Sequence, residues 1–312
     1  MWRLLSGILL GWGLGANDSA NIFGTAVSSR MVKYSTAIIL TAIFVMFGAI
    51  LQGEEGMNTL KGLTAQNQMT AFITSLAAAI TVIIMTVLKL PISTSQAVVG
   101  AIIGLGIMQK DVNASGLTKV VTAWIGTPIG GFLFTIILYH LIYQLFKWIR
   151  PTIFQSDIFI KIGLLVAGCY GAYALGANNV ANVTGVYVAG GILTPSQATL
   201  IGGISIAIGT LTFSREVMFT VGKSIVKLDA FSALITVVAH SITVHIYAVI
   251  GVPVSTSQAI IGAILAIGFI KGVQTINFTL LLRIVSAWFM TPVIGLLLSM
   301  FLYFIMHLQY VS

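Results

Sequence analysis

Long apolar runs separated by short polar or glycine-rich breaks occupy almost the whole chain. A membrane-spanning helix needs about 20 mostly apolar residues, so runs of this length predict transmembrane helices and leave little chain for a domain outside the bilayer. We therefore predict an all-α polytopic membrane protein with about ten to twelve transmembrane segments. The apolar runs cover 4–29, 34–52, 69–88, 92–109, 117–147, 158–190, 198–214, 230–250, 254–270 and 276–310.

Several of these runs contain helix-disturbing residues in mid-course. The runs at 4–29 and 158–190 contain the polar segments GAND and GANN. Two other runs contain Pro128 and Pro292. Interruptions of this kind predict helices that are broken inside the membrane. Five runs lie on each side of a linker expected at Lys147–Lys161.

The second half of the chain repeats the first half. Three motifs recur in the same order and at nearly constant spacing, which predicts two transmembrane repeats at 1–150 and 151–312. Because each half has an odd number of crossings, the second repeat is expected to be inverted, as in many secondary transporters with a midplane site. The matches are GANDSANIFG at 15–24 with GANNVANVTG at 176–185, PISTSQ at 91–96 with PVSTSQ at 253–258, and VVTAWIGTPIGGFL at 120–133 with IVSAWFMTPVIGLL at 284–297.

Composition and charge exclude several classes of protein. Only 7% of residues are charged and 58% are hydrophobic, whereas soluble domains carry about 25% charged residues, so a soluble protein is excluded. The net charge of +8 comes without a basic cluster interleaved with aromatics, which argues against a nucleic-acid partner. Most Lys and Arg residues fall on one side if both termini are outside, which predicts a cytoplasmic central linker. We expect a multi-pass protein of the plasma membrane. The lone Cys169 excludes a disulfide framework.

The first copy of the repeated motif places a carboxylate in the middle of an apolar run. An Asp at the centre of a membrane helix costs roughly 2.5 to 3.5 kcal/mol on insertion scales, so Asp18 requires a compensating partner. No basic residue of the same run is placed to pair with it. A bound cation would neutralise Asp18, with Asn17, Asn21 and freed backbone carbonyls supplying neutral oxygens. The alternative is that these Asn side chains cap two half-helices.

The PISTSQ motif has the pattern of a helix start. A proline followed by hydroxyl residues and an apolar run predicts a half-helix whose N-terminus presents free N–H groups and the positive end of the helix dipole. Two such ends facing one point suit a tetrahedral oxyanion. The alternative is that the hydroxyls bond back within their own helices. The two copies comprise Pro91, Ser93, Thr94, Ser95 and Gln96, and Pro253, Ser255, Thr256, Ser257 and Gln258.

The segments GANDSAN and GANNVAN, together with the two STSQ segments, resemble the duplicated signature of the inorganic phosphate transporter (PiT) family, and the resemblance covers both halves. It implies symport of inorganic phosphate with Na+ or H+ across the lipid bilayer, with no ATP hydrolysis and no cofactor. By position, it assigns phosphate binding to Ser93, Thr94, Ser95, Gln96, Ser255, Thr256, Ser257, Gln258, Asn17 and Asn178. It assigns the coupling ion to Asp18, Asn21, Asn179 and Asn182, with Na+ at Asp18, Asn21 and Asn182.

One position departs from the family pattern. The pattern has Asp in both copies of the first motif, and here the second is Asn179. This removes one buried negative charge, so a second cation site or a proton-carrying carboxylate is lost or weakened. Some members of the superfamily carry sulfate, which therefore stays as the alternative substrate.

The alternatives to a monomeric carrier are a channel, an enzyme and a homodimer. A passive anion channel would pass current without a coupling gradient, whereas a carrier saturates. An enzyme is not expected, because the four histidines form no HExxH or Ser-His-Asp arrangement. Gly100 and Gly104 form a GxxxG motif whose expected use is close helix packing within the chain, with homodimerisation as the alternative.

Overall fold

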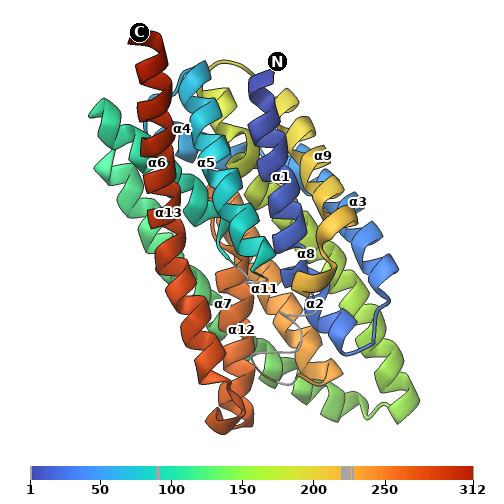
Figure 1. Cartoon of the computed structure of the whole chain (residues 1–312). Coiled ribbons are helices and arrows are strands. Elements are labelled where there is room, and N and C mark those ends of the chain that lie inside the picture. Colours follow the sequence, from blue (N-terminus) through green and yellow to red (C-terminus); the bar gives the residue numbers. More distant parts are fainter. Residues whose placement is uncertain (1, 89–91, 219–225, 227, 312) are drawn as a thin grey trace.

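The computed structural model describes residues 2–88, 92–218, 226 and 228–311, and throughout them the regular structure is helical (Figure 1). This confirms the predicted all-α polytopic fold, with most helix bounds within a few residues of the apolar runs. The elements are η1 (Trp2–Leu4), α1 (Leu5–Asp18), α2 (Ala20–Ser28), α3 (Tyr34–Gln52), α4 (Glu55–Lys61), α5 (Gln68–Val87), α6 (Thr94–Gln109), α7 (Ala114–Ile149), α8 (Ile153–Ala189), α9 (Pro195–Phe213), α11 (Ala230–Ile250), α12 (Thr256–Lys271), η2 (Val273–Thr275) and α13 (Phe278–Val311).

The apolar helices fall into two length classes. Among the described residues, seven helices are long and apolar enough to cross a membrane, namely α3, α5, α7, α8, α9, α11 and α13. By contrast, α6 and α12 have 16 residues each. At 1.5 Å per residue, each covers about 24 Å, which is less than the hydrocarbon core of about 30 Å. Neither is therefore long enough to cross that core alone, which agrees with the expected half-helices.

One of the predicted breaks is present and three predicted breaks are wrong. Helix α1 ends at Asp18 and α2 begins at Ala20, so the first GAND segment interrupts the helix. Helix α8 runs unbroken through the GANN segment at 176–179. Helices α7 and α13 likewise continue through Pro128 and Pro292.

Threonines support the helix beside each proline. Thr127 Oγ1 and Thr291 Oγ1 each donate a hydrogen bond of 2.6 Å to the carbonyl four residues earlier. These bonds reinforce the preceding turn, whereas the carbonyls that lose a helical donor are those of Trp124 and Trp288, four residues before each proline. Membrane helices tolerate proline where neighbouring helices and local adjustments stabilise the interrupted backbone. In α8, the Asn178 amide bonds the backbone of Val252 and Val254, and the Asn179 amide bonds the Asn182 side chain, so neither competes with the backbone hydrogen bonds of the helix.

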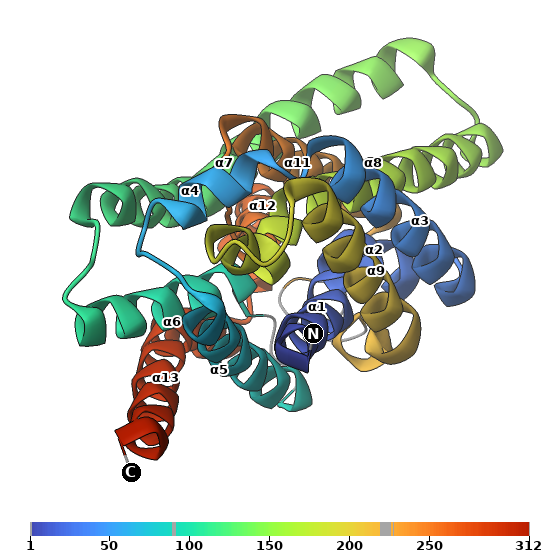
Figure 2. The same cartoon turned by 90° about the horizontal axis from the view of Figure 1, so that it is seen from above.

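The two halves are joined by a tight turn rather than a linker. The connection expected at Lys147–Lys161 is helical for most of its length, because α7 continues to Ile149 and α8 begins at Ile153. Thr152 caps α8 by accepting a hydrogen bond from the Gln155 N–H, which explains this early start. The turn lies at the periphery of the bundle (Figure 2), at the end opposite both chain termini (Figure 1).

Helices of one half pack mainly on helices of the other half. Helix α1 packs on α9 and α3 packs on α8, while α7 packs on α12 and α13 packs on α6. Glycines permit these contacts in matched pairs. A Cβ at Gly15 would lie 1.9 Å from the Ile206 oxygen, and a Cβ at Gly176 would lie 2.1 Å from the Val45 oxygen. The halves therefore interlock.

The GxxxG motif is used within the chain, as expected. A Cβ at Gly100 would lie 2.2 Å from the Pro292 oxygen, and a Cβ at Gly104 would lie 2.4 Å from the Leu296 oxygen. The corresponding position in the second half, Gly262, meets the Pro128 oxygen at 2.1 Å. These contacts bring α6 against α13 and α12 against α7 at the backbone level.

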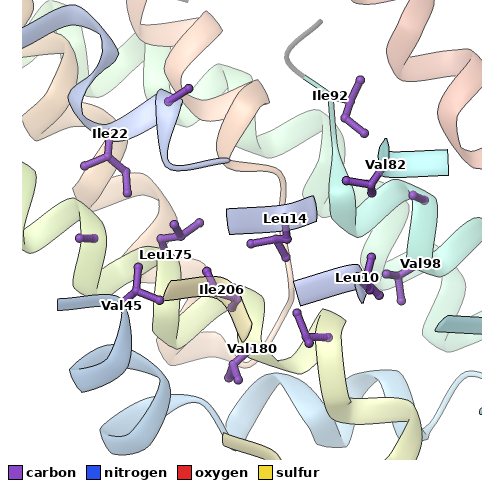
Figure 3. Packing of buried hydrophobic residues seen from close by; sticks show 14 of the residues in the cluster. Leu10, Leu14, Ile22, Val45, Val82, Ile92, Val98, Leu175, Val180 and Ile206 are labelled. Atoms are coloured by element: carbon purple, nitrogen blue, oxygen red, sulfur yellow. The ribbon is translucent and has the colours of Figure 1, made fainter. Parts of the chain in front are cut away.

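The apolar core surrounds the end of α1. Leu10 and Leu14 are fully buried and belong to one cluster with Val82 of α5, Val98 of α6 and Ile206 of α9 (Figure 3). Leu14 lies one helical turn before Asp18. The packing that fixes α1 in the bundle thus also fixes the position of the buried carboxylate.

Candidate functional site

The break between α1 and α2 places a carboxylate at the centre of the molecule. Asp18 is the last residue of α1, Ser19 forms the junction, and Asn21 lies in the first turn of α2. All three are at most 1% exposed. Gly15 lets this segment approach the backbone of α9, so the break is held from one side by helix packing.

The two half-helices begin beside this break. Ser93 and Ser255 are the N-cap residues of α6 and α12, and each Oγ accepts a hydrogen bond of 3.2 Å from the N–H three residues later. Thr94 and Thr256 follow as the first helical residues, and both are 1% exposed. Pro91 of the first motif lies outside the described residues. The predicted helix starts at Ser93 and Ser255 are therefore present and buried.

Asp18 lies between the two half-helix starts. Thr94 Oγ1 donates to Asp18 Oδ1 at 3.5 Å, and Thr256 also hydrogen-bonds the Asp18 side chain. Asn21 Nδ2 donates to Thr256 Oγ1 at 3.2 Å and to Ser257 Oγ at 3.1 Å. The structure thus brings together the first GAND motif and both STSQ motifs.

The asparagines of the second motif make the matching contacts. Asn182 Nδ2 donates to Ser95 Oγ at 2.8 Å, as Asn21 does to Ser257. It also donates to Asn179 Oδ1 at 2.9 Å. Ser95 Oγ in turn donates to the Val254 carbonyl at 2.8 Å. Asn21 and Asn182, which end the two motifs, therefore each bond the STSQ segment of the other half.

The first asparagine of each motif holds the segment just before the half-helix of its own repeat. Asn17 Oδ1 accepts from the Ile92 N–H at 3.4 Å, and Asn178 Oδ1 accepts from the Val254 N–H at 3.1 Å. Asn17 Nδ2 also donates to Thr86 Oγ1 at 3.1 Å, a contact that the motifs do not predict. These bonds position the two helix starts relative to Asp18.

Among the described residues, Asp18 has no basic partner. No ion pair to Asp18 is present within the part of the chain that the structure describes. Several buried oxygens in or beside the two repeated motifs have no hydrogen-bond partner among the described residues, namely Ser19 Oγ, Asn21 Oδ1, Thr25 Oγ1 and Asn182 Oδ1. Buried polar atoms are rarely left unpartnered in folded proteins.

A carboxylate accompanied by neutral oxygens is the donor set of a hard cation. In the described residues, no group of three or more His, Cys, Asp or Glu side chains could hold a transition metal. The chemistry of the site thus fits an alkali cation or a proton at Asp18. Sequence reasoning missed Ser19 and Thr25, although both lie within or next to the repeated motif.

The glutamines of the STSQ segments line a cavity to which Asp18 does not contribute. Gln96 and Gln258 are 5% and 4% exposed, and their side chains line a cavity between α7 and α13. Their Oε1 atoms have no hydrogen-bond partner among the described residues. The threonines of the same motifs face Asp18, because successive residues of a helix point in different directions around its axis.

Comparisons with known proteins agree over nearly the full chain. The profile of the phosphate transporter family matches residues 14–299. The sulfate permease CysP of Bacillus subtilis is 31% identical over 304 residues, covering 95% of this chain and 85% of that protein. A "Putative phosphate permease" of Methanocaldococcus jannaschii is 30% identical over 286 residues, covering 92% of this chain and 91% of that protein. The solved structure of a sodium-dependent phosphate transporter has the same fold, with a TM-score of 0.85, 22% identity, and 99% and 100% coverage of the two chains.

Proposed function

We propose that this chain, which belongs to the phosphate transporter family and is therefore a membrane carrier rather than an enzyme, moves inorganic phosphate in symport with Na+ or H+. One observation supports the proposal above all others. A single buried carboxylate, Asp18, lies between the N-termini of two half-helices that carry hydroxyl side chains. An oxyanion beside this carboxylate would be repelled unless a cation bound with it, so the arrangement makes anion and cation binding interdependent.

The residues divide into two sets with different chemistry. The coupling ion is proposed to bind the carboxylate and the amide oxygens around it, with Na+ at Asp18, Asn21 and Asn182 and with Asn179 beside it. Phosphate is proposed to bind the helix starts, where N–H groups and hydroxyls supply donors without a full positive charge. The phosphate-binding set comprises Ser93, Thr94, Ser95, Gln96, Ser255, Thr256, Ser257, Gln258, Asn17 and Asn178. In the present arrangement the side chains of Gln96 and Gln258 line the cavity between α7 and α13, so we propose their contact with phosphate for another state of the transport cycle.

Alternating access is proposed to use the two repeats, 1–150 and 151–312, as inverted halves around this site. The matched packing of α1 on α9 and α8 on α3, and of α7 on α12 and α13 on α6, supports this arrangement. Each repeat contributes one half-helix, so a movement of one half-helix relative to the other would expose the site on one side at a time. We further propose that both termini face the outside of the plasma membrane, with the α7–α8 turn in the cytoplasm.

Sulfate is the second candidate substrate, and Asn179 is the residue that favours it. Hydrogenphosphate carries a proton that it can donate to an acceptor, whereas sulfate has none at neutral pH and needs only donors. Replacing the family's second Asp by Asn179 removes a strong acceptor beside the site. The 31% identity to a sulfate permease agrees with this possibility. The resemblance to the phosphate carriers in both STSQ segments keeps phosphate as the first proposal.

Uptake into proteoliposomes tests the proposal. The purified chain is reconstituted, and uptake of radiolabelled phosphate and sulfate is measured in parallel under an imposed Na+ gradient, an imposed H+ gradient, or neither. A symporter gives saturable phosphate uptake that requires one of the gradients. Sulfate uptake that exceeds phosphate uptake would transfer the proposal to sulfate, and uptake or current that does not saturate and needs no gradient would indicate a channel.

The symmetry of the anion site gives a second test. Removing the hydroxyl of Thr94 or of Thr256 by substitution with valine is expected to weaken anion affinity by the value of a hydrogen bond to a charged group, about 1.5 to 3 kcal/mol in each case. Phosphate affinity is measured from the concentration dependence of uptake. Thr118→Val is the matched control, because Thr118 is exposed and its hydroxyl donates to the Ala114 carbonyl of its own helix. If only one of the two substitutions weakened phosphate affinity, the proposal of an anion site formed by both half-helix starts would be wrong.

A further inference from the structure

The α7–α8 turn projects from the helix bundle. Thr135 is the last buried residue of α7, and Ile160 is the first buried residue of α8. No residue between them is buried, although this part of the chain is helical except at 150–152. Figure 2 shows the hairpin at the periphery, away from the other helices. Most of its surface is therefore free to contact a partner outside the chain.

Large apolar side chains and basic side chains lie together at this turn. Trp148, Ile153 and Phe154 are 82%, 86% and 74% exposed. Lys147 and Arg150 are also exposed. Apolar side chains are favoured among acyl chains, whereas a basic side chain is costly there and is favoured among anionic headgroups. Both requirements are met at the boundary between the hydrocarbon and the headgroups.

The length of α7 brings the turn to this boundary. Residues 120–146 contain no Asp, Glu, Lys or Arg, and Lys119 and Lys147 flank them. At 1.5 Å per residue, this helical stretch covers about 40 Å, which exceeds the hydrocarbon core of about 30 Å. The two flanking lysines therefore lie at opposite surfaces of the membrane, and the residues after Lys147 lie at the level of the headgroups.

The charges of Lys147 and Arg150 are available to a partner. Neither side chain forms an ion pair or a hydrogen bond within the described part of the chain. Together with Gln144 and Trp148 they line a surface hollow of about 510 Å³. A guanidinium binds phosphate through two parallel hydrogen bonds, and an ammonium adds a point charge. This pair of cations favours an anionic phosphodiester over a zwitterionic headgroup, because the cation of the zwitterion would be repelled.

We propose that the α7–α8 turn binds an anionic phospholipid at the membrane surface, with Lys147 and Arg150 at its phosphate and Trp148 beside its acyl chains. The segment 147–161 carries three basic residues and one acidic residue, Asp157, so its net positive charge attracts the anionic headgroup. This segment contains no residue of the proposed ion or phosphate sites. The lipid site therefore depends neither on the transport function nor on which side of the membrane the turn faces.

Quenching of tryptophan fluorescence by brominated lipids tests this site. The full chain is reconstituted in phosphatidylcholine vesicles with an increasing share of dibromo-phosphatidylglycerol, and dibromo-phosphatidylcholine at the same shares is the reference. Trp148→Phe gives the background from the other tryptophans, so the difference from the parent reports Trp148. We expect the quenching of Trp148 to show an affinity on the order of 10- to 30-fold higher for the anionic lipid, since each Lys or Arg near the surface contributes about fivefold.

Two double variants separate this site from general lipid contact. Lys147→Gln combined with Arg150→Gln should abolish the preference for the anionic lipid and leave contact with both lipids. Lys110→Gln combined with Lys119→Gln is the matched control and should keep the preference, because both lysines are exposed near the other end of α7, and Lys110, like Arg150, follows a helix with a positive φ.

High salt gives a further test that needs no substitution. Screening of the two cations should reduce the preference of the parent for the anionic lipid, and this measurement decides if the double variant at the turn does not fold. An equal preference in the parent and in K147Q/R150Q, a preference that persists at high salt, or quenching that is unchanged in Trp148→Phe would overturn the proposal.

Discussion

Replacement of Asp18 by asparagine is expected to abolish gradient-driven uptake. The substitution keeps the size of the side chain and its contacts with Thr94 and Thr256, but it removes the charge that attracts the coupling ion. An opposite charge about 4 Å away is worth about 4 kcal/mol at an effective dielectric constant near 20, which corresponds to about a thousandfold in cation affinity. Uptake of radiolabelled phosphate into proteoliposomes under the coupling gradient measures the effect.

The protein should fold at least as well after this change. Asp18 is 1% exposed and carries no ion pair within the described residues, so its charge costs stability in the absence of a cation. Asp229→Asn is the matched control, because Asp229 is an exposed acid at the start of α11 that pairs with Lys271, away from the site. Asp18→Asn that retains half of the parental uptake or more would remove Asp18 from the coupling mechanism.

The sequence alone predicts the helices well, because a helix that lies in a membrane needs a long apolar run that is visible in the sequence. The runs at 34–52 and 230–250 coincide with α3 and α11, and the other apolar runs differ from their helices by only a few residues at most ends. Lipid cannot satisfy a backbone hydrogen bond, so each apolar run must be helical wherever it lies in the bilayer. The same argument does not reveal whether a polar motif interrupts a helix.

Helix breaks depend on tertiary contacts that the local sequence does not contain. GAND at 15–18 ends a helix, yet GANN at 176–179 lies inside α8, although the two segments differ at one position. Pro128 and Pro292 remain inside helices, and their backbone packs closely on Gly262 of α12 and Gly100 of α6. Local propensity is a weak predictor where packing decides the backbone.

The sequence predicts which residues belong to the candidate site but not how they are grouped. The internal repeat identifies Asp18, Thr94 and Thr256 as chemically important, and the structure brings these three together. Their grouping depends on how the two halves interlock, which no local pattern encodes. Gln96 and Gln258 illustrate this limit, because they share a motif with the threonines but line a cavity to which the threonines do not contribute.

Restoring the second acid by Asn179→Asp is expected to add a cation requirement. Asn179 is 1% exposed, its Oδ1 accepts from Asn182 Nδ2 at 2.9 Å, and its Nδ2 has no partner among the described residues. An Asp at this position would keep the bond from Asn182 but bring a second buried carboxylate near Asp18 and the anion. Like charges about 6 Å apart at an effective dielectric constant near 20 repel by about 3 kcal/mol, so uptake at low Na+ should fall on the order of 10- to 100-fold.

At high Na+ the same variant should recover, because a second cation would neutralise the new carboxylate. Phosphate uptake by Asn179→Asp is therefore expected to rise more steeply with Na+ than uptake by the parent, with a higher Hill coefficient. Asn179→Ala is the matched control, since it removes the amide without adding charge and should leave the steepness unchanged. If parent and Asn179→Asp show the same Hill coefficient and the same anion affinity, position 179 lies outside the ion path. The Asn179 amide would then serve only to orient Asn182 toward Ser95, and coupling would depend on the first motif alone.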